Sequence, residues 1–207
     1  MRFPVAERFK SIQGEGLFCG TPMAFVRLVG CSVGKEICSA CDADFDRVMP
    51  EMGGGLYTPE ELRDWVGDFR YVCVTGGEPL DRDLRPLLDA IEAAFHVETS
   101  GTKQPEWLAI RRPTWMTVSP KPGFNEPWML EQADEIKVVF GGLGCGTGWP
   151  TVEDAARWAE AGKLVYLQPR NQPDAIDPRE MAAVIQIVLE HPRLRLSAQL
   201  HKYLAVR

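Results

Sequence analysis

Short apolar runs alternate along this chain with segments that open on helix-start signals. Two of these signals join an N-cap residue, a first-turn proline and a capping-box glutamate: Thr58-Pro59-Glu60-Glu61 and Asp177-Pro178-Arg179-Glu180. The pattern predicts helices over residues 62–66, 83–94, 151–161 and 181–189. It predicts strands over residues 24–29, 71–74, 95–98, 115–118, 136–140 and 164–168.

Strands that alternate with helices predict an α/β fold built from parallel strand-helix-strand units. About six units are too few for a closed eight-stranded barrel, so we expect a partial, open (β/α)6-type TIM barrel. One domain should span residues 1–207, because this length suits a single hydrophobic core. Ligands of such folds bind at the carboxyl ends of the strands. The polar residues at the carboxyl ends of the predicted strands are Cys31, 75–78, 98–100, 119–121 and Gln168.

Composition narrows the class of ligand. The formal charge of -6, without a cluster of lysines and arginines, argues against a nucleic-acid surface. No apolar run approaches the ~18 residues of a membrane span, and the first residues do not lead into a signal-peptide core. We therefore expect a cytoplasmic protein that acts on a small molecule.

Three of the six cysteines, Cys31, Cys38 and Cys41, lie close together after the first predicted strand. In a reducing compartment such spacing indicates metal or cluster ligation rather than disulfides. Three thiolates can hold a 4Fe-4S cluster with one iron open to S-adenosylmethionine. A structural zinc site is the alternative, but it usually has four ligands, and no nearby His or Cys supplies a fourth.

The remaining cysteines have no comparable pattern. Cys73 lies inside a predicted strand, where a thiol packs as a small hydrophobe. Cys19 and Cys145 fall in glycine-rich loops without a partner nearby in the sequence. The turn at 75–79, Thr-Gly-Gly-Glu-Pro, adds weight to the cluster, because residues without side chains let backbone groups reach a small ligand.

The motifs taken in order closely resemble the 7-carboxy-7-deazaguanine synthases. These radical S-adenosylmethionine enzymes convert 6-carboxy-5,6,7,8-tetrahydropterin into 7-carboxy-7-deazaguanine and ammonia in deazapurine and queuosine biosynthesis. The resemblance runs from residue 9 to the C-terminus. It rests on residues 9–16 (FKSIQGEG), 26–31 (VRLVGC), 41–42 (CD), 75–80 (TGGEPL), 98–102 (ETSGT), 119–121 (SPK) and 201–202 (HK).

The resemblance implies a set of residues around the cofactor. Cys31, Cys38 and Cys41 ligate the 4Fe-4S cluster, and Glu98 and Ser100 hold the ribose of S-adenosylmethionine. A solvated strand end is an equally good interpretation of these last two. The other implied cofactor contacts are Ala40, Gly77, Ser119, Pro120, Lys121, Gln168, Pro169, Arg170 and Asn171.

On the substrate side, the chemistry of the implied residues suits a pterin. Amides and carboxylates pair with the ring edge, and Arg27 can form a bidentate contact with the substrate carboxylate. The resemblance further implies a homodimer and a flavodoxin-like electron donor. The implied substrate residues are Ile12, Gln13, Gly14, Glu15, Arg27, Thr75, His201 and the C-terminal Arg207.

Two features depart from the family pattern. Six residues separate Cys31 from Cys38, where radical S-adenosylmethionine enzymes usually have three, and a loop accommodates such an insertion. Ala43 stands where the family has a hydroxyl ligand of magnesium. A methyl group cannot bind a hard cation, so either Asp42 or Asp44 replaces the ligand or substrate and water hold the metal.

Two other function classes stay open on the sequence. A different small radical S-adenosylmethionine enzyme, such as an activase for a glycyl-radical enzyme, would share the cysteines and the glycine turn. It has no evident need for Arg27, His201 and the Gln-Gly-Glu at 13–15. A non-enzymatic zinc or iron-sulfur module is the second class.

Overall fold

The computed structural model describes the chain except residues 39–40, 42–45, 142–146, 173–174 and 207. Its described strands form one nine-stranded sheet in the order β3-β1-β2-β4-β5-β6-β7-β8-β9. The strands are β1 (Phe3–Ile12), β2 (Pro22–Leu28), β3 (Gly55–Tyr57), β4 (Tyr71–Gly76), β5 (Ala94–Thr99), β6 (Trp115–Val118), β7 (Glu135–Phe140), β8 (Val165–Pro169) and β9 (Arg195–Leu196).

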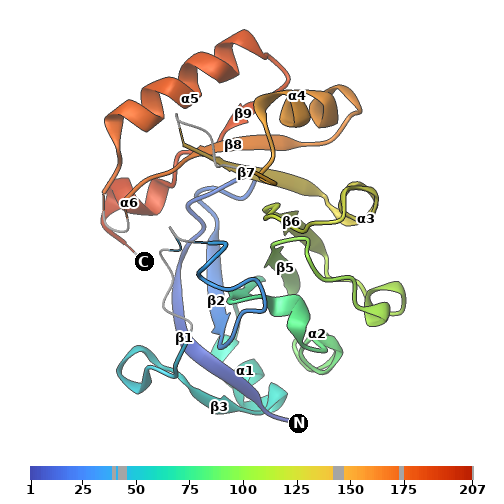
Figure 1. The fold of residues 1–207 in the computed structure, drawn as a ribbon. Coiled ribbons are helices and arrows are strands. Elements are labelled where there is room, and N and C mark those ends of the chain that lie inside the picture. The colour runs from blue at the N-terminus through green and yellow to red at the C-terminus, as the bar shows by residue number, and fades with distance from the viewer. Residues whose placement is uncertain (39–40, 42–45, 142–146, 173–174, 207) are drawn as a thin grey trace.

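The sheet confirms the predicted open α/β architecture. Every neighbouring pair from β2 to β9 is parallel. β3 and β9 are its two edges, so the barrel stays open (Figure 1). All six predicted strands are present as β2 and β4 to β8.

The sequence pattern missed three strands. β1 pairs antiparallel with both β2 and β3. Pro4, Glu7, Arg8 and Lys10 interrupt its apolar positions, which hid the alternation that marks a strand. β3 and β9 have three and two residues, too few to show any period.

Helices cover the outer face of the curved sheet (Figure 1). Thr58 caps α1 with the predicted reciprocal pair of hydrogen bonds to Glu61, and Asp177 caps α5 by accepting from the backbone of Arg179 and Glu180. The helices are α1 (Pro59–Val66), α2 (Arg85–Ala90), α3 (Glu126–Gln132), α4 (Val152–Glu160), α5 (Pro178–Glu190) and α6 (Leu200–Leu204).

The helix predicted over 83–94 is shorter than expected. α2 ends at Ala90, and Ile91 is extended, with φ -111° and ψ 116°. Leu84, Leu87, Leu88 and Ile91 are all buried, and their helical spacing suggested a continuous helix. Ile91 reaches the same core from the link that leads into β5.

Side chains alternate strictly across the parallel strands. On β4 and β5, Val72, Val74, Phe95 and Val97 belong to the large core between sheet and helices. The residues between these positions point into the barrel, where Met23, Phe25 and Cys73 form a second, smaller apolar cluster. The inner positions nearer the carboxyl ends of the strands carry polar side chains. They are Arg27, Thr75, Glu98, Thr117, Lys137 and Gln168.

Candidate active site

A cavity of about 540 Å³ opens at the carboxyl ends of the parallel strands. Except for Pro120, every described residue that the sequence assigned to a cofactor or a substrate lines it; Ala40 and Arg207 lie outside the described residues. These lining residues are Ile12, Gln13, Gly14, Glu15, Arg27, Cys31, Cys38, Cys41, Thr75, Gly77, Glu98, Ser100, Ser119, Lys121, Gln168, Pro169, Arg170, Asn171 and His201.

The three cysteines lie at one end of this cavity, on the loop that follows β2. Backbone hydrogen bonds shape the loop: the Cys38 N–H donates to Gly34 O at 3.1 Å, and the Cys41 N–H donates to Cys38 O at 2.9 Å. Burial raises the pKa of the Cys38 thiol, although the nearby Lys121 ammonium acts in the opposite direction. Three sulfur donors on one loop fit a cluster with one iron that lacks a protein ligand.

A carboxylate beyond the glycine turn anchors the same loop. The Ser32 backbone N–H donates to Asp81 Oδ2 at 2.8 Å, and the Ser32 hydroxyl donates to Asp81 Oδ1 at 2.6 Å. Asp81 ends the short 3-10 helix Pro79–Asp81. The cysteine loop and the glycine turn are therefore fixed relative to each other.

Gly77 is required by packing between these two loops. A Cβ on Gly77 would lie 1.6 Å from Gly30 O, and the Gly77 N–H donates to Leu28 O at 3.1 Å. The sequence predicts that the bare backbone serves a ligand. The structure adds a second reason, since no residue with a side chain fits here.

Glu78 closes the glycine turn onto the end of β5. Its buried carboxylate accepts from the Thr99 hydroxyl at 2.6 Å, from the Ser100 N–H at 2.8 Å and from the Ser100 hydroxyl. Ser100, which the resemblance placed at a ribose, also contacts the Thr102 hydroxyl at 2.9 Å. Its hydroxyl thus has two partners within the protein.

At the other end of the cavity, Lys137, Glu15 and Glu98 form a charged floor. The Lys137 ammonium donates to Glu15 Oε2 and lies 4.0 Å from Glu98 Oε1. Burial alone would raise the pKa of Glu15, but the charge and hydrogen bond of Lys137 and a hydrogen bond from Gln199 hold it well below its usual range. The pKa of Glu98 is also lowered, because Lys137 outweighs the effect of burial.

Glu98 faces the residues assigned to the substrate. Its carboxylate accepts from Gln13 Nε2 at 3.1 Å and from the Thr75 hydroxyl at 3.2 Å. The resemblance placed Glu98 at a ribose together with Ser100. In the structure the two side chains have separate partners, Glu98 on the floor and Ser100 at Glu78.

His201 and Gly14 are in close contact. A Cβ on Gly14 would lie 2.0 Å from His201 Nδ1, and the Leu200 N–H donates to Gly14 O at 2.8 Å. This contact places the start of α6 over the segment that follows β1. Residues at opposite ends of the chain thus meet at the cavity, as the sequence resemblance implied for Gln13, Gly14 and His201.

Comparison with known proteins agrees with this geometry, although no protein-family model matches the chain. The 7-carboxy-7-deazaguanine synthase of Bradyrhizobium diazoefficiens is 34% identical over 228 residues, and that of Escherichia coli is 32% identical over 236 residues, with both chains covered in full in each case. The Synechocystis protein of the same name is 33% identical, covering 99% of this chain and 94% of its own length. The chain belongs to the 7-carboxy-7-deazaguanine synthase family.

The fold of this family is also matched by a solved structure. The crystal structure of QueE from Escherichia coli superposes with a TM-score of 0.71 at 29% identity, covering 97% of this chain and 95% of that one. The synthase family is a family of enzymes, so the comparisons do not support the non-enzymatic module. Among the described residues, no helix combines the length and apolar character needed to cross a membrane.

Lys137, Gln199 and Trp149 are among the residues lining this cavity that sequence reasoning missed. Lys137 lies on β7 and Gln199 precedes α6, and both contact Glu15. Trp149 lies beside Lys121, whose ammonium is 5.7 Å from the ring centre. For Lys137 a signal existed: a lysine within an otherwise apolar strand has to be paired if it is buried.

Beneath the floor, donor atoms of Cys73, His96 and Glu98 lie within 4.8 Å of one another. Cys73 is buried in an apolar cluster, as predicted. Burial lowers the pKa of His96 to about 4, so the ring is neutral at physiological pH, and its Nε2 lies 2.7 Å from the Thr117 hydroxyl. This is a possible metal site by distance, yet both Glu98 oxygens already accept hydrogen bonds.

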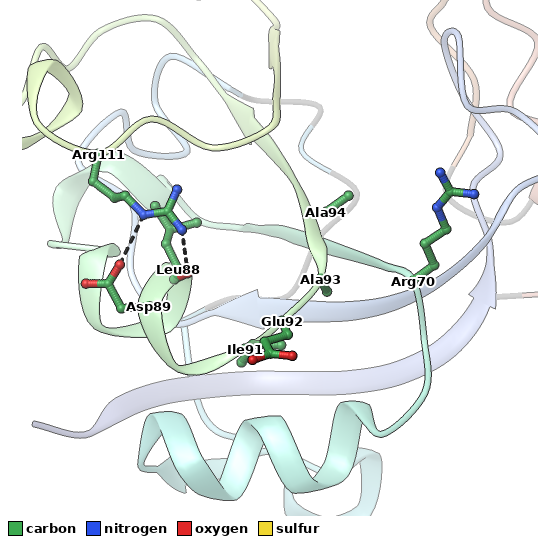
Figure 2. A pocket seen from close by; sticks show the side chains of 8 residues that line it. All are labelled: Arg70, Leu88, Asp89, Ile91, Glu92, Ala93, Ala94 and Arg111. Carbon is green, nitrogen blue, oxygen red and sulfur yellow. Dashed lines mark hydrogen bonds and ion pairs between the residues drawn. The ribbon is translucent and has the colours of Figure 1, made fainter.

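A second hollow lies at the opposite end of β4 and β5 and is shown in Figure 2. Arg111 is held there by Asp89 at 3.0 Å and by Leu88 O at 2.8 Å. Arg70 lines the hollow well apart from Arg111 (Figure 2), and its guanidinium lies 5.3 Å from the centre of the Tyr71 ring. The polar groups that line this hollow do not converge on one point. We therefore place the active site in the other cavity, at the carboxyl ends of the strands.

Proposed function

We propose that this chain is a radical S-adenosylmethionine enzyme that converts 6-carboxy-5,6,7,8-tetrahydropterin into 7-carboxy-7-deazaguanine and ammonia. One observation carries the proposal: a single cavity joins three cysteines at one end to a charged, hydrogen-bonding floor at the other. A cofactor site and a pterin site can therefore share it. Membership in the synthase family supports the same reaction.

Cys31, Cys38 and Cys41 would hold the 4Fe-4S cluster. Their thiols line the cavity together, and the donor set suits iron-sulfur ligation. Reductive cleavage of S-adenosylmethionine to a 5'-deoxyadenosyl radical is the chemistry that the bound cluster supplies.

Lys121 and its neighbours would bind S-adenosylmethionine beside the cysteines. The partly buried Lys121 ammonium donates to Ser119 O at 2.8 Å and to the Ser119 hydroxyl at 2.7 Å, which fixes it at the cavity wall. Burial lowers the pKa of Lys121. The remaining proposed contacts are Ala40, Gly77, Ser100, Pro120, Gln168, Pro169, Arg170 and Asn171.

On the floor, the pterin would be oriented by charge. Arg27 would pair with its carboxylate, and the acceptors Glu15 and Glu98 would take ring N–H groups. Ile12, Gln13, Gly14, Thr75, His201 and Arg207 complete the proposed substrate contacts. A preorganised floor of this kind orients the reacting ring.

Magnesium binding is proposed to depend on substrate and water or on Asp42 or Asp44, since Ala43 offers no oxygen ligand. These three positions lie outside the described residues. By likeness to the family, we further propose a homodimer that works in the cytoplasm with a flavodoxin-like electron donor.

Anaerobic cluster reconstitution tests the cofactor assignment. Cys31→Ala, Cys38→Ala and Cys41→Ala should each lose the visible absorbance of the cluster and the cleavage of S-adenosylmethionine. Cys73→Ala is the matched control, because its buried thiol lies in an apolar cluster away from the loop. Loss of the cluster in Cys73→Ala, or its retention in any of the other three, would refute the assignment.

A further inference from the structure

Lys137 is the charged residue at the centre of the cavity floor. It lies in the middle of β7 on the inner face of the sheet, and it is 6% exposed. Its ammonium joins Glu15, from the segment after β1, to Glu98, at the end of β5. Two segments 83 positions apart in the sequence thus share one cation.

Removal of the Lys137 ammonium would leave an excess of negative charge on the carboxylates around it. Glu15, Glu98 and Glu135 all interact electrostatically with its ammonium. His96 beside Glu98 is neutral, Glu15 also faces His201, and Lys121 is bound to Ser119 at the cavity wall. Two partly buried carboxylates without the ammonium between them would favour protonation of one, because like charges in a poorly solvated site disfavour ionisation.

Protonation would change what the floor can recognise. Ionised carboxylates only accept hydrogen bonds, whereas a protonated carboxyl also presents a donor. Neutral protein groups already donate to both carboxylates: Gln168 and Gln199 to Glu15 Oε1 at 3.2 and 2.8 Å, and Gln13 and Thr75 to Glu98. The remaining accepting capacity therefore faces the cavity.

We propose that Lys137 is a positioning residue: it holds the carboxylates of Glu15 and Glu98 as a fixed pair of hydrogen-bond acceptors and so selects ligands whose ring edge presents N–H donors. This inference rests on the proposed function, because a carboxylated pterin has such an edge. Arg27 takes the carboxylate of the same ligand, and the charge of Lys137 is used within the protein.

Steady-state kinetics with carboxytetrahydropterin between pH 6 and 9 test the inference. Lys137→Met should raise KM by about 10-fold or more, since two acceptors are weakened. KM should now fall as pH rises, because the carboxyls must first lose a proton. Substrate-independent cleavage of S-adenosylmethionine, measured in the same preparations, should change by a smaller factor than KM, because the cysteine loop is untouched. Lys163→Met is the control, because this lysine lies outside the cavity lining and its ammonium donates to the Ala133 carbonyl at 3.3 Å.

Two further variants keep the test informative if Lys137→Met does not fold. Lys137→Arg should recover part of the affinity and the flat pH profile, since it keeps the charge. K137M/E15Q removes one charge of each sign and should regain stability lost in Lys137→Met while the raised KM persists. A folded Lys137→Met enzyme with unchanged KM and an unchanged pH profile would overturn the inference.

A stability measurement separates this inference from the proposed function. In Lys137→Met the buried carboxyls should have a pKa above that of the unfolded chain, so its melting temperature should fall from pH 5 to pH 7 relative to Lys163→Met. In the unmodified protein the same carboxyls are already ionised over this range. Failure of the unmodified enzyme to convert the pterin refutes the function alone; absence of the stability difference refutes the role of Lys137 alone.

Discussion

Arg27 donates from Nε to Glu7 Oε1 at 2.7 Å, across the antiparallel pair of β1 and β2. Glu7 is buried, and the Arg27 side chain lines the cavity. The resemblance assigned Arg27 to the substrate carboxylate. The salt bridge uses Nε, the guanidinium nitrogen nearest the backbone. This contact orients Arg27 within the cavity.

Arg27→Ala should weaken binding of carboxytetrahydropterin by on the order of 2 to 5 kcal/mol, because a charge-assisted pair in a poorly solvated site is lost. Substrate-independent cleavage of S-adenosylmethionine should survive. Parallel assays of the two activities give the measurement, with the exposed Arg63→Ala as the control. An equal loss of both activities would show that Arg27 supports the whole cavity rather than the substrate.

Glu7→Gln provides a graded version of the same test. The amide keeps a hydrogen-bond acceptor for Arg27 but removes the charge, so KM should rise by less than in Arg27→Ala, about 3- to 10-fold. A Glu7→Gln effect as large as that of Arg27→Ala would mean that orientation, and not the guanidinium itself, limits binding.

Buried His96 should make the protein less stable in mild acid. Its folded pKa of about 4 lies below the unfolded value of 6.5, so the unfolded state binds more protons and stability falls as the pH drops from 6.5 towards 4. The loss should reach about 2 kcal/mol by pH 4.5. Chemical unfolding at several pH values measures it, and His96→Gln should flatten the curve in this window. A curve as steep in His96→Gln would assign the effect to other groups.

Gly77→Ala should destabilise the protein by about 1 to 3 kcal/mol or more, since its methyl group would overlap the Gly30 carbonyl. Gly141→Ala is a suitable control, because the atom nearest to its added methyl group would be Cδ of the flexible Arg170 side chain at 3.6 Å. Thermal unfolding compares the two. Equal melting temperatures would mean that the two loops can separate at little cost.

Magnesium should matter little to turnover if Ala43 truly removes a ligand. Ala43→Thr should then increase the dependence by restoring an oxygen ligand. Titration of magnesium into chelator-treated enzyme, with product formation as the readout, decides this. A strong dependence in the unmodified enzyme that is lost in Asp42→Asn or Asp44→Asn would instead assign the ligand to that aspartate. If a strong dependence survives both changes, substrate and water hold the metal.

Periodicity was enough to predict the parallel strands, because each has a core-facing row of apolar residues such as Val72 and Val74. It missed β1, whose inner and outer positions include Glu7, Arg8 and Lys10. These charges are stabilised by tertiary partners: Glu7 by Arg27, and Arg8 by stacking over the Tyr57 ring at 4.1 Å. Such partners lie far away in the sequence and leave no local signal.

The candidate site was predictable where motifs follow strands, as for Cys31, Thr75 and Gln168. Lys137 left one signal, a lysine within an apolar strand, but its partners and the role of Gln199 depend on contacts across the barrel. Gln199 adopts a left-handed conformation, with φ 53°, and donates to Glu15 from 184 positions along the chain. Only the folding of the whole chain brings that amide to the carboxylate.

We expect the ring contraction of a carboxylated pterin to take place in this cavity. The most direct measurement is an anaerobic assay of the reconstituted enzyme with reductant, S-adenosylmethionine and 6-carboxy-5,6,7,8-tetrahydropterin, with the product followed by ultraviolet absorbance and mass. The account predicts 7-carboxy-7-deazaguanine and one ammonia for each pterin consumed, and no product from Cys31→Ala. Cleavage of S-adenosylmethionine by the reduced enzyme with the pterin left unchanged would contradict it.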